Sequence, residues 1–305
     1  MLAIPFDKNN TMKYRVHYLL FLTFFLPIVL GYAQQDPHFS LYKYNMNVVN
    51  PAFAGSNENT EILLAARSQW VGIEGAPETF NLNVNKPVGK NLGLGFNAIT
   101  DEVSVLSETH LYVDFSYKIA LSRTVALYGG IKAGGSSLRI NLMDIGIAND
   151  PLFTENSSTF NPNFGVGFYL KADRFYVSLS APGFLKNTRY EKEGVVPVSA
   201  SDRTHFFLGG GYDILLNQRY WKIRPSTLLK IVPGAPVSLD VTSAVWYADY
   251  LEFGVNYRIG ESYTGFATVG VLDNTFRIGY AFENSANGLQ RIGGASHEIV
   301  LKFSK

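Results

Sequence analysis

Apolar and polar residues alternate along many short segments of this chain, as they do in β-strands that have one apolar face. In the segment TFNLNVN, Phe80, Leu82 and Val84 alternate with polar residues. In the segment 109–119 the odd positions from 111 to 119 carry apolar or aromatic residues, and the even positions carry mostly polar residues. The pattern recurs along the whole chain, and no helical segment is available to cover the apolar faces. The sequence therefore predicts an all-β protein.

The periodicity predicts about 14 strands, most of them long enough to cross a bilayer at a tilt of about 45°. They are 61–71, 78–86, 91–101, 107–120, 123–137, 162–172, 174–181, 203–215, 219–231, 236–247, 250–259, 263–272, 275–284 and 296–304. The connections alternate between long ones, such as 138–161 and 182–202, and short ones, such as KPVGK. Short turns on one rim and longer loops on the other are typical of outer-membrane barrels, whose short turns are periplasmic. An even strand number places both termini at that periplasmic rim.

A sheet with open edges would leave backbone groups unpaired in lipid, so the sheet must close. We therefore predict a transmembrane antiparallel β-barrel over residues 61–305. The alternative is a soluble sandwich or a periplasmic lipocalin-like barrel, which would bury charged mid-strand residues in a dry core at high cost. A wet lumen accepts such residues. The side chains predicted to face the lumen are His110, Asp114, Lys118, Lys132, Lys171, His205, Asp240, Glu252 and Arg258.

The N-terminus has the features of a secretory signal peptide. From Met12 the chain has basic residues, then an apolar stretch at 18–30, then small residues. We expect residues 1–33 to be removed by cleavage after Ala33, with Met12 as an alternative start because residues 1–11 lack signal character. The mature chain contains no further apolar run that predicts a transmembrane helix. The expected location is the cell outer membrane.

Composition agrees with an exported barrel and excludes several classes of function. Charged residues make up 17% of the chain, against about 25% in ordinary soluble domains, and aromatic residues make up 14%. The absence of cysteine excludes disulfides, thiol catalysis and a lipid-modified N-terminal cysteine. A net charge of +1 gives no electrostatic basis for binding nucleic acid.

Residues 34–60 stand outside the strand pattern. The segment mixes Pro, Asn and Gly with four aromatic residues, Phe39, Tyr42, Tyr44 and Phe53, more than a simple linker would carry. One interpretation is a plug or strap packed against the periplasmic mouth of the barrel. The other is a docking element for a periplasmic partner. The sequence does not separate these two interpretations.

Four stretches, QDPHFSLYKYN, VNPAFAGS, ARSQWVGIEGAPETFNL and SHEIVLKF, resemble the PorP/SprF family of outer-membrane proteins. This family belongs to the type IX secretion and gliding machinery of Bacteroidota, and the resemblance covers essentially the whole mature chain. It implies a non-enzymatic accessory barrel that helps deliver or anchor secreted surface proteins such as adhesins. The implied partners are outer-membrane lipid, cargo with a C-terminal sorting domain and a periplasmic peptidoglycan-associated protein.

The resemblance also supplies candidate partner-binding residues. They are Asp36, Pro37, Phe39, Tyr42, Asn50, Pro51, Phe53, Gly55, Arg67, Gln69 and Trp70. An architectural role is the alternative, because an Asn-Pro pair favours a turn and a Trp near a rim anchors a barrel at the membrane boundary.

The residues favour neither an enzyme nor a cofactor protein. The mature chain has four histidines, and no GxSxG nucleophile motif accompanies them. Glycines at alternate positions, such as Gly93 and Gly95, fall within predicted strands, where they permit bending and close packing rather than phosphate binding. We expect no catalytic, cofactor or metal site. The remaining alternative to an accessory barrel is a porin or solute-specific channel, which would conduct ions and tolerate loss of 34–60.

Overall fold

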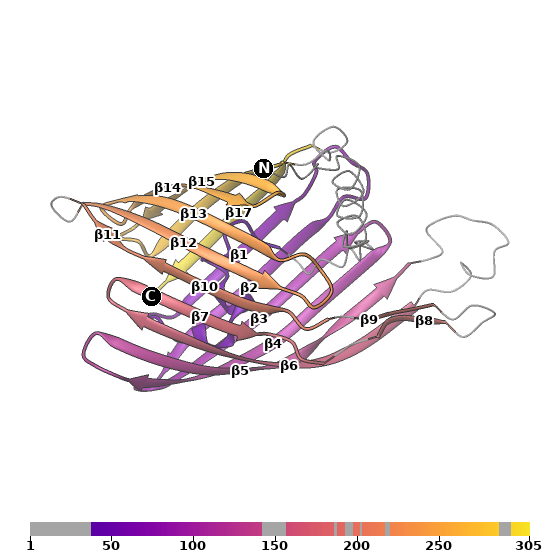
Figure 1. Cartoon of the computed structure of the whole chain (residues 1–305), viewed down its shortest axis with the longest axis horizontal. Coiled ribbons are helices and arrows are strands. Elements are labelled where there is room, and N and C mark those ends of the chain that lie inside the picture. Colours follow the sequence, from indigo (N-terminus) through magenta and orange to yellow (C-terminus); the bar gives the residue numbers. More distant parts are fainter. Residues whose placement is uncertain are drawn as a thin grey trace, which may run out of the picture. The chain divides into compact units, whose positions relative to one another are not determined.

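The structure is a computed structural model that describes residues 38–141, 157–185, 188–192, 198–201, 203–216, 220–286 and 294–305. These residues belong to one compact unit that runs from Gln34 to Lys305. The predicted signal peptide and the candidates Asp36 and Pro37 lie outside the described residues. Figure 1 shows how the strands are arranged. The bounds of the barrel strands lie within about five residues of the predicted ones.

Nearly all regular structure in the described residues is β-strand, because alternating apolar and polar residues suit a sheet with lipid on one side. The strands are β1 (Glu61–Ser68), β2 (Glu78–Val88), β3 (Leu92–Val103), β4 (Leu106–Ala120), β5 (Val125–Ile140), β6 (Ser157–Ala172), β7 (Phe175–Ala181), β8 (Thr188–Lys192), β9 (Val198–Ser201), β10 (Phe206–Tyr212), β11 (Ile214–Leu215), β12 (Trp221–Ile231), β13 (Ser238–Tyr247), β14 (Leu251–Arg258), β15 (Ser262–Val271), β16 (Phe276–Ser285) and β17 (Ser296–Ser304). Two short helical elements, α2 (Met46–Val49) and η1 (Pro51–Phe53), precede them.

The strands form one closed antiparallel barrel. Consecutive barrel strands pair with each other, and β1 pairs with β17 from Glu61 opposite Ser304 to Ser68 opposite His297. The strands β10 and β11 are two parts of one interrupted strand, because both pair with β12. Counted this way, the barrel has 14 strands, as predicted. The hairpin of β8 and β9 is a separate two-stranded sheet, which we had expected to be loop.

The two rims of the barrel differ in their connections. The connections at one rim, called the short-turn rim, include 89–91, 121–124, 173–174, 248–250 and 272–275. The start of β1 and the end of β17 also lie at this rim. The connections at the other rim, called the long-loop rim, include 69–77, 141–156, 182–205 and 286–295. Two connections at the long-loop rim, 104–105 and 259–261, are nevertheless short, so the alternation of long and short connections is not strict. Short turns are periplasmic in such barrels.

The outer surface of the barrel is apolar where lipid would surround it. On β4, Leu111, Val113 and Phe115 are 52%, 55% and 40% exposed, whereas the neighbouring even-numbered residues Asp114 and Ser116 are buried. The same alternation holds on β14, where Phe253 and Val255 are exposed. The pleat thus turns apolar side chains to the lipid and polar side chains to the lumen. Within the described residues, no helix is long and apolar enough to cross a membrane.

Candidate functional site

Residues 38–60, called the inner segment here, pass through the lumen from one rim to the other. At one end, His38 contacts Arg258, the last residue of β14 at the long-loop rim. At the other end, Thr60 exchanges two backbone hydrogen bonds of 2.8 and 2.9 Å with Lys305 at the short-turn rim. We had expected residues 34–60 at the periplasmic mouth. The aromatic content set this segment apart from a simple linker, but the sequence left open both a plug or strap at the mouth and a docking element for a partner.

Apolar side chains of the inner segment pack against lumen-facing side chains in two clusters. In the first, Phe39 and Leu41 lie among residues of β1, β3, β13, β15, β16 and β17, including Val300, which is fully buried. In the second, Tyr42 and Met46 pack with residues of β5, β6 and β12. Burying one such side chain is worth roughly 1.5–3 kcal/mol. The inner segment therefore belongs to the hydrophobic core of the protein.

Strand glycines let the inner segment approach the barrel wall closely. A Cβ on Gly93 would overlap the backbone of Ala54, and a Cβ on Gly130 would overlap the backbone of Ala52. The Ser116 hydroxyl donates a hydrogen bond of 2.5 Å to the Ala54 carbonyl beside this contact. Glycine in a strand often marks such a close approach of backbone to backbone.

A chain of amide and charged groups ties the inner segment to β2, β3, β4 and β5. Asn81 donates to Asn45 at 2.7 Å, and Asn97 donates to Asp114 at 2.5 Å. Lys132 lies 3.3 Å from the Asp114 carboxylate and donates to the carbonyl of Asn47 at 2.8 Å. Buried charges are tolerated when they are paired and hydrogen-bonded. The inner segment supplies one of these partners, the Asn47 carbonyl that accepts from Lys132.

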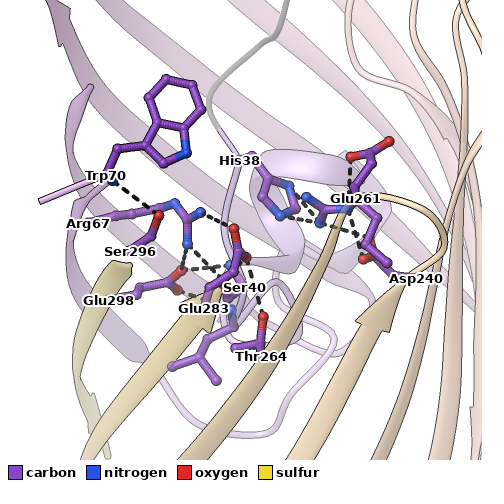
Figure 2. Close-up of polar contacts among 12 residues, drawn as sticks. His38, Ser40, Arg67, Trp70, Asp240, Glu261, Thr264, Glu283, Ser296 and Glu298 are labelled. Carbon is purple, nitrogen blue, oxygen red and sulfur yellow. Dashed lines mark hydrogen bonds and ion pairs between the residues drawn. The ribbon is translucent and has the colours of Figure 1, made fainter. Parts of the chain in front are cut away.

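Arg67 is the centre of a buried ionic cluster that joins β1, β16 and β17 to the inner segment (Figure 2). Its guanidinium lies 2.8 Å from the Glu283 carboxylate and 3.4 Å from the Glu298 carboxylate. It also donates to the Ser40 hydroxyl at 2.6 Å. Glu298 accepts from the backbone N–H groups of Ser40 at 2.6 Å and Leu41 at 3.1 Å. The cluster thus holds the inner segment through both side-chain and backbone groups.

A second ionic cluster surrounds Arg258 at the long-loop rim (Figure 2). Arg258 Nε lies 3.0 Å from Asp240 and 3.7 Å from Glu261, and its Nη2 contacts the His38 ring. Burial lowers the pKa of His38 well below its usual value, and the positive charges of Arg258, Arg67 and Lys230 lower this pKa further. His38 is therefore neutral at neutral pH.

The third charged contact of the inner segment is an ion pair between Lys43 and the fully buried Glu252 on β14. Tyr44 donates to the same carboxylate at 2.5 Å. The Lys43 ammonium also lies 5.0 Å from the ring centre of Trp246. Burial, together with nearby cations, lowers the pKa of Lys43. The carboxylate in direct contact opposes this effect and favours the charged form.

Two cavities lie on opposite sides of the inner segment. The long-loop cavity, about 150 Å³ in volume, is lined by residues toward the long-loop rim, among them His38, His110, His205 and Lys230. The short-turn cavity, about 300 Å³, is lined by residues toward the short-turn rim, among them Arg174, Arg224 and Lys302. The inner segment contributes lining residues to both cavities and lies between them.

The residues expected to face the lumen are buried or partly buried in the structure. Asp114, Lys132, Asp240, Glu252 and Arg258 form the ion pairs described above. His110 lies 3.6 Å from Glu108, and Lys171 donates to Ser56 and Asn57 of the inner segment at 2.9 and 2.8 Å. The His205 ring stacks with Phe207, and Lys118 lies 6.0 Å from the ring centre of Tyr128.

The candidate partner-binding residues separate into two groups. Phe39, Tyr42, Asn50, Pro51 and Arg67 are buried inside the barrel, and Phe53 and Gly55 are partly buried there. Burial inside the barrel agrees with the architectural alternative, and partner binding by these residues stays a prediction. Gln69 and Trp70 are partly exposed in the connection 69–77 at the long-loop rim.

The sequence did not indicate that Ser40, Lys43, Glu283 and Glu298 hold the inner segment in place. Glu298 falls in the recognised SHEIVLKF stretch, but only the fold brings it to Ser40, which is 258 residues away in the chain. Within the described residues, no group of three or more His, Asp or Glu side chains is arranged to hold a metal ion.

Solved structures with the same general architecture are outer-membrane proteins of low sequence identity. They include the Acinetobacter baumannii outer membrane protein Omp33 (8% identity, 81% of this chain and 99% of that chain, TM-score 0.49) and the KdgM porin (12%, 80% and 99%, 0.40). A Pseudomonas aeruginosa FadL homologue is 12% identical, with 84% and 91% coverage and a TM-score of 0.48. No curated protein matches the chain.

The family comparison covers most of the chain. Residues 31–303 match the family described as Type IX secretion system membrane protein PorP/SprF. The match spans all 14 strands of the closed barrel and the whole inner segment. The protein is thus an outer-membrane β-barrel, and the chain belongs to the PorP/SprF family of type IX secretion system membrane proteins.

Proposed function

We propose that this protein is a non-enzymatic accessory barrel of the type IX secretion and gliding machinery, which helps deliver or anchor secreted surface proteins such as adhesins. Its partners would be cargo with a C-terminal sorting domain and a periplasmic peptidoglycan-associated protein. The observation that carries the proposal is the inner segment, which occupies the lumen. It is held there by hydrogen bonds from Ser40 to Glu298 and from Arg67 to Ser40, by the contact of Arg258 with His38, and by the ion pair of Glu252 with Lys43.

The occupied lumen favours this function over a porin. A barrel of 14 strands is intermediate between barrels filled by side chains and the open 16-stranded porins, so its size alone permits a channel. Here backbone of the inner segment touches the wall at Gly93 and Gly130, and buried charges face the segment. Moving the segment aside would leave those charges without their partners. A lumen that the inner segment keeps closed suits a protein that binds its partners at the rims of the barrel.

One feature of the long-loop rim suits a protein partner. In the connection 69–77, Val71 and Ile73 are 50% and 37% exposed. The connection is nevertheless ordered by hydrogen bonds of 3.1 Å from Val71 to Ala295 and 3.0 Å from Ser104 to Gly75. A rigid loop that exposes apolar side chains loses little entropy on binding. We assign this loop, with Gln69 and Trp70, as the partner-binding candidate on the extracellular side.

The experiment is mild crosslinking in native cells, followed by affinity capture and mass spectrometry. We expect a large surface protein or a periplasmic peptidoglycan-binding protein to be recovered with the barrel. Val71→Asp should reduce recovery of the surface protein, whereas Val237→Asp, at an equally exposed position in another connection of the same rim, should not. Recovery of the barrel alone, together with steady ion conductance in planar bilayers, would refute the proposal and favour the porin.

A further inference from the structure

The long-loop cavity brings together three of the four histidines of the mature chain. His38 comes from the inner segment, His110 from β4, and His205 from the residue before β10. Three cationic side chains, Lys132, Arg203 and Lys230, line the same cavity. Apart from Arg203 and His205, these residues are more than 20 positions apart in the sequence, so only the closed barrel and its inner segment place them around one space.

The described lining of this cavity carries positively charged side chains and no negatively charged ones. Among the described residues that line it, none is aspartate or glutamate. Three carboxylates that contact groups on or beside the lining are already engaged: Asp114 with Lys132, Glu108 with His110, and Asp240 with Arg258. Lys230 forms no ion pair within the described part of the chain. Among the described residues, the cavity therefore offers the positive charge of Lys230, which no carboxylate there pairs with.

A buried hydrogen-bond donor on the lining also lacks a partner. Asn45 is fully buried, and its side-chain oxygen accepts from Asn81. Its Nδ2 donates to no acceptor in the described residues. A buried polar group without a partner is destabilising, and an anionic acceptor in the cavity would give the Asn45 amide its missing partner.

Much of the remaining lining is apolar, and one wall is held in place by hydrogen bonds. Phe39, Ile99, Leu185 and Leu228 supply apolar surface. The wall at 182–185 is fixed by Asn163, whose oxygen accepts from the backbone of Leu185 at 3.0 Å and of Phe184 at 2.9 Å. Apolar walls with a few placed polar groups are the usual composition of a small-molecule site.

We propose that the long-loop cavity binds a carboxylate carried on a small apolar body, with the carboxylate near Lys230 and Asn45 and the apolar body against Phe39 and Leu228. The volume of about 150 Å³ equals that of an apolar cavity known to accommodate benzene, so the body is about the size of one ring. Such a carboxylate is found in a free organic acid and at the C-terminus of a peptide that ends in an apolar residue. This inference does not depend on the proposed function.

The test measures binding to the purified, detergent-solubilised full-length barrel by isothermal titration calorimetry. The first pair of probes is 3-phenylpropanoate and its uncharged isostere 3-phenylpropanamide. We expect the acid to bind at least about tenfold more tightly, because a charge-assisted hydrogen bond adds roughly 1.5–3 kcal/mol. Equal binding of acid and amide, or no binding of the acid and of the peptide probes below, would overturn the proposal.

A second pair of probes distinguishes the two sources of carboxylate. These are a short acetylated peptide that ends in phenylalanine with a free carboxylate, and the same peptide with an amidated end. Tighter binding of the free-carboxylate peptide than of the free acid would identify a protein terminus as the ligand. The reverse order would identify a free organic acid. Either order supports a carboxylate site.

Two matched variants on β12 locate the site. Lys230→Gln should weaken binding of the acid by about tenfold. Lys222→Gln should leave it unchanged, because Lys222 lies at the opposite end of β12, where it pairs with Asp249 at 2.8 Å. Equal effects of the two variants would place binding elsewhere and overturn the assignment. The comparison of acid with amide uses the unaltered protein, so it decides the proposal even if a variant fails to fold.

Discussion

The backbone N–H of Ser40 donates a hydrogen bond of 2.6 Å to Oε2 of Glu298, which joins the start of the inner segment to the last strand of the barrel. The same carboxylate is 3.4 Å from Arg67 on the first strand. Two kinds of contact therefore stabilise the pairing of β1 with β17: the ladder of backbone hydrogen bonds, and a buried cluster of side chains that includes the inner segment. Closure of the barrel and the position of the inner segment are coupled through these residues.

Loss of the Glu298 charge should weaken this coupling. In Glu298→Gln the contacts with Ser40 and Arg67 lose their charge-assisted character, each such bond being worth roughly 1.5–3 kcal/mol. We expect the heat-modifiable shift in electrophoretic mobility to occur at a lower temperature. Glu261→Gln is the control, since that side chain is 47% exposed and 3.7 Å from Arg258, and exposed ion pairs contribute little. Equal shifts in both variants would contradict the coupling.

Removal of the inner segment should open the lumen. Deletion of residues 38–59 leaves the strands and their pairing intact but exposes Arg67, Lys132 and Glu252 to water that fills the space. We expect a folded, heat-modifiable barrel that conducts ions in planar bilayers, whereas the intact protein conducts little. Similar conductance before and after deletion would show that the segment does not close the lumen.

A side chain at Gly130 should displace the inner segment. A Cβ there meets the backbone of Ala52, whereas a Cβ on the adjacent Gly129 meets only the Phe168 ring at 3.9 Å. Gly130→Leu should therefore raise conductance and lower stability by about 1–3 kcal/mol, as overpacking does, and Gly129→Leu should do neither. Conductance measured on both variants checks the difference, and matching behaviour of the two would refute the close contact.

The lipid-facing side of β4 should not tolerate a cation. Phe115 is 40% exposed near the middle of the strand, and arginine at the centre of a membrane costs about 2–4 kcal/mol on a barrel. Phe115→Arg should reduce the fraction of protein assembled in the outer membrane, whereas Phe115→Leu should not. Normal assembly of the arginine variant, measured by fractionation and heat modifiability, would mean that the two faces are assigned in reverse.

Acid should loosen the long-loop end of the inner segment. The pKa of His38 is lowered mainly by burial and then by Arg258, Arg67 and Lys230, so the released segment binds a proton more readily than the docked one. The stabilisation from neutral His38 is complete above the usual pKa of about 6.5 and declines as pH falls below it, because docking then requires loss of a proton. Conductance and proteolysis of the segment should increase between about pH 6.5 and 5. In His38→Gln this pH dependence should be reduced; unchanged dependence would assign it to another group.

The sequence by itself determined the number of strands, their approximate ends and the face that each side chain takes. This information is local, because a strand has a period of two and lipid accepts only apolar side chains. The alternation alone assigns Phe115 and Asp114 to opposite faces of the sheet, without information on which strands lie beside β4. The hairpin of β8 and β9 was missed; it forms a sheet separate from the barrel, and its strands of five and four residues are short for a periodicity to show.

Only the tertiary structure decided where the N-terminal segment lies and what holds it. The sequence pattern does not distinguish Glu298 or Arg67 from any other polar residue at a lumen-facing position of a strand. Their pairing with each other and with Ser40 follows from closure of the barrel, which brings the two ends of the chain together. The same closure gathers His38, His110 and His205 around one cavity. Contacts between residues so distant in the chain depend on three-dimensional geometry, which alternation along a strand does not encode.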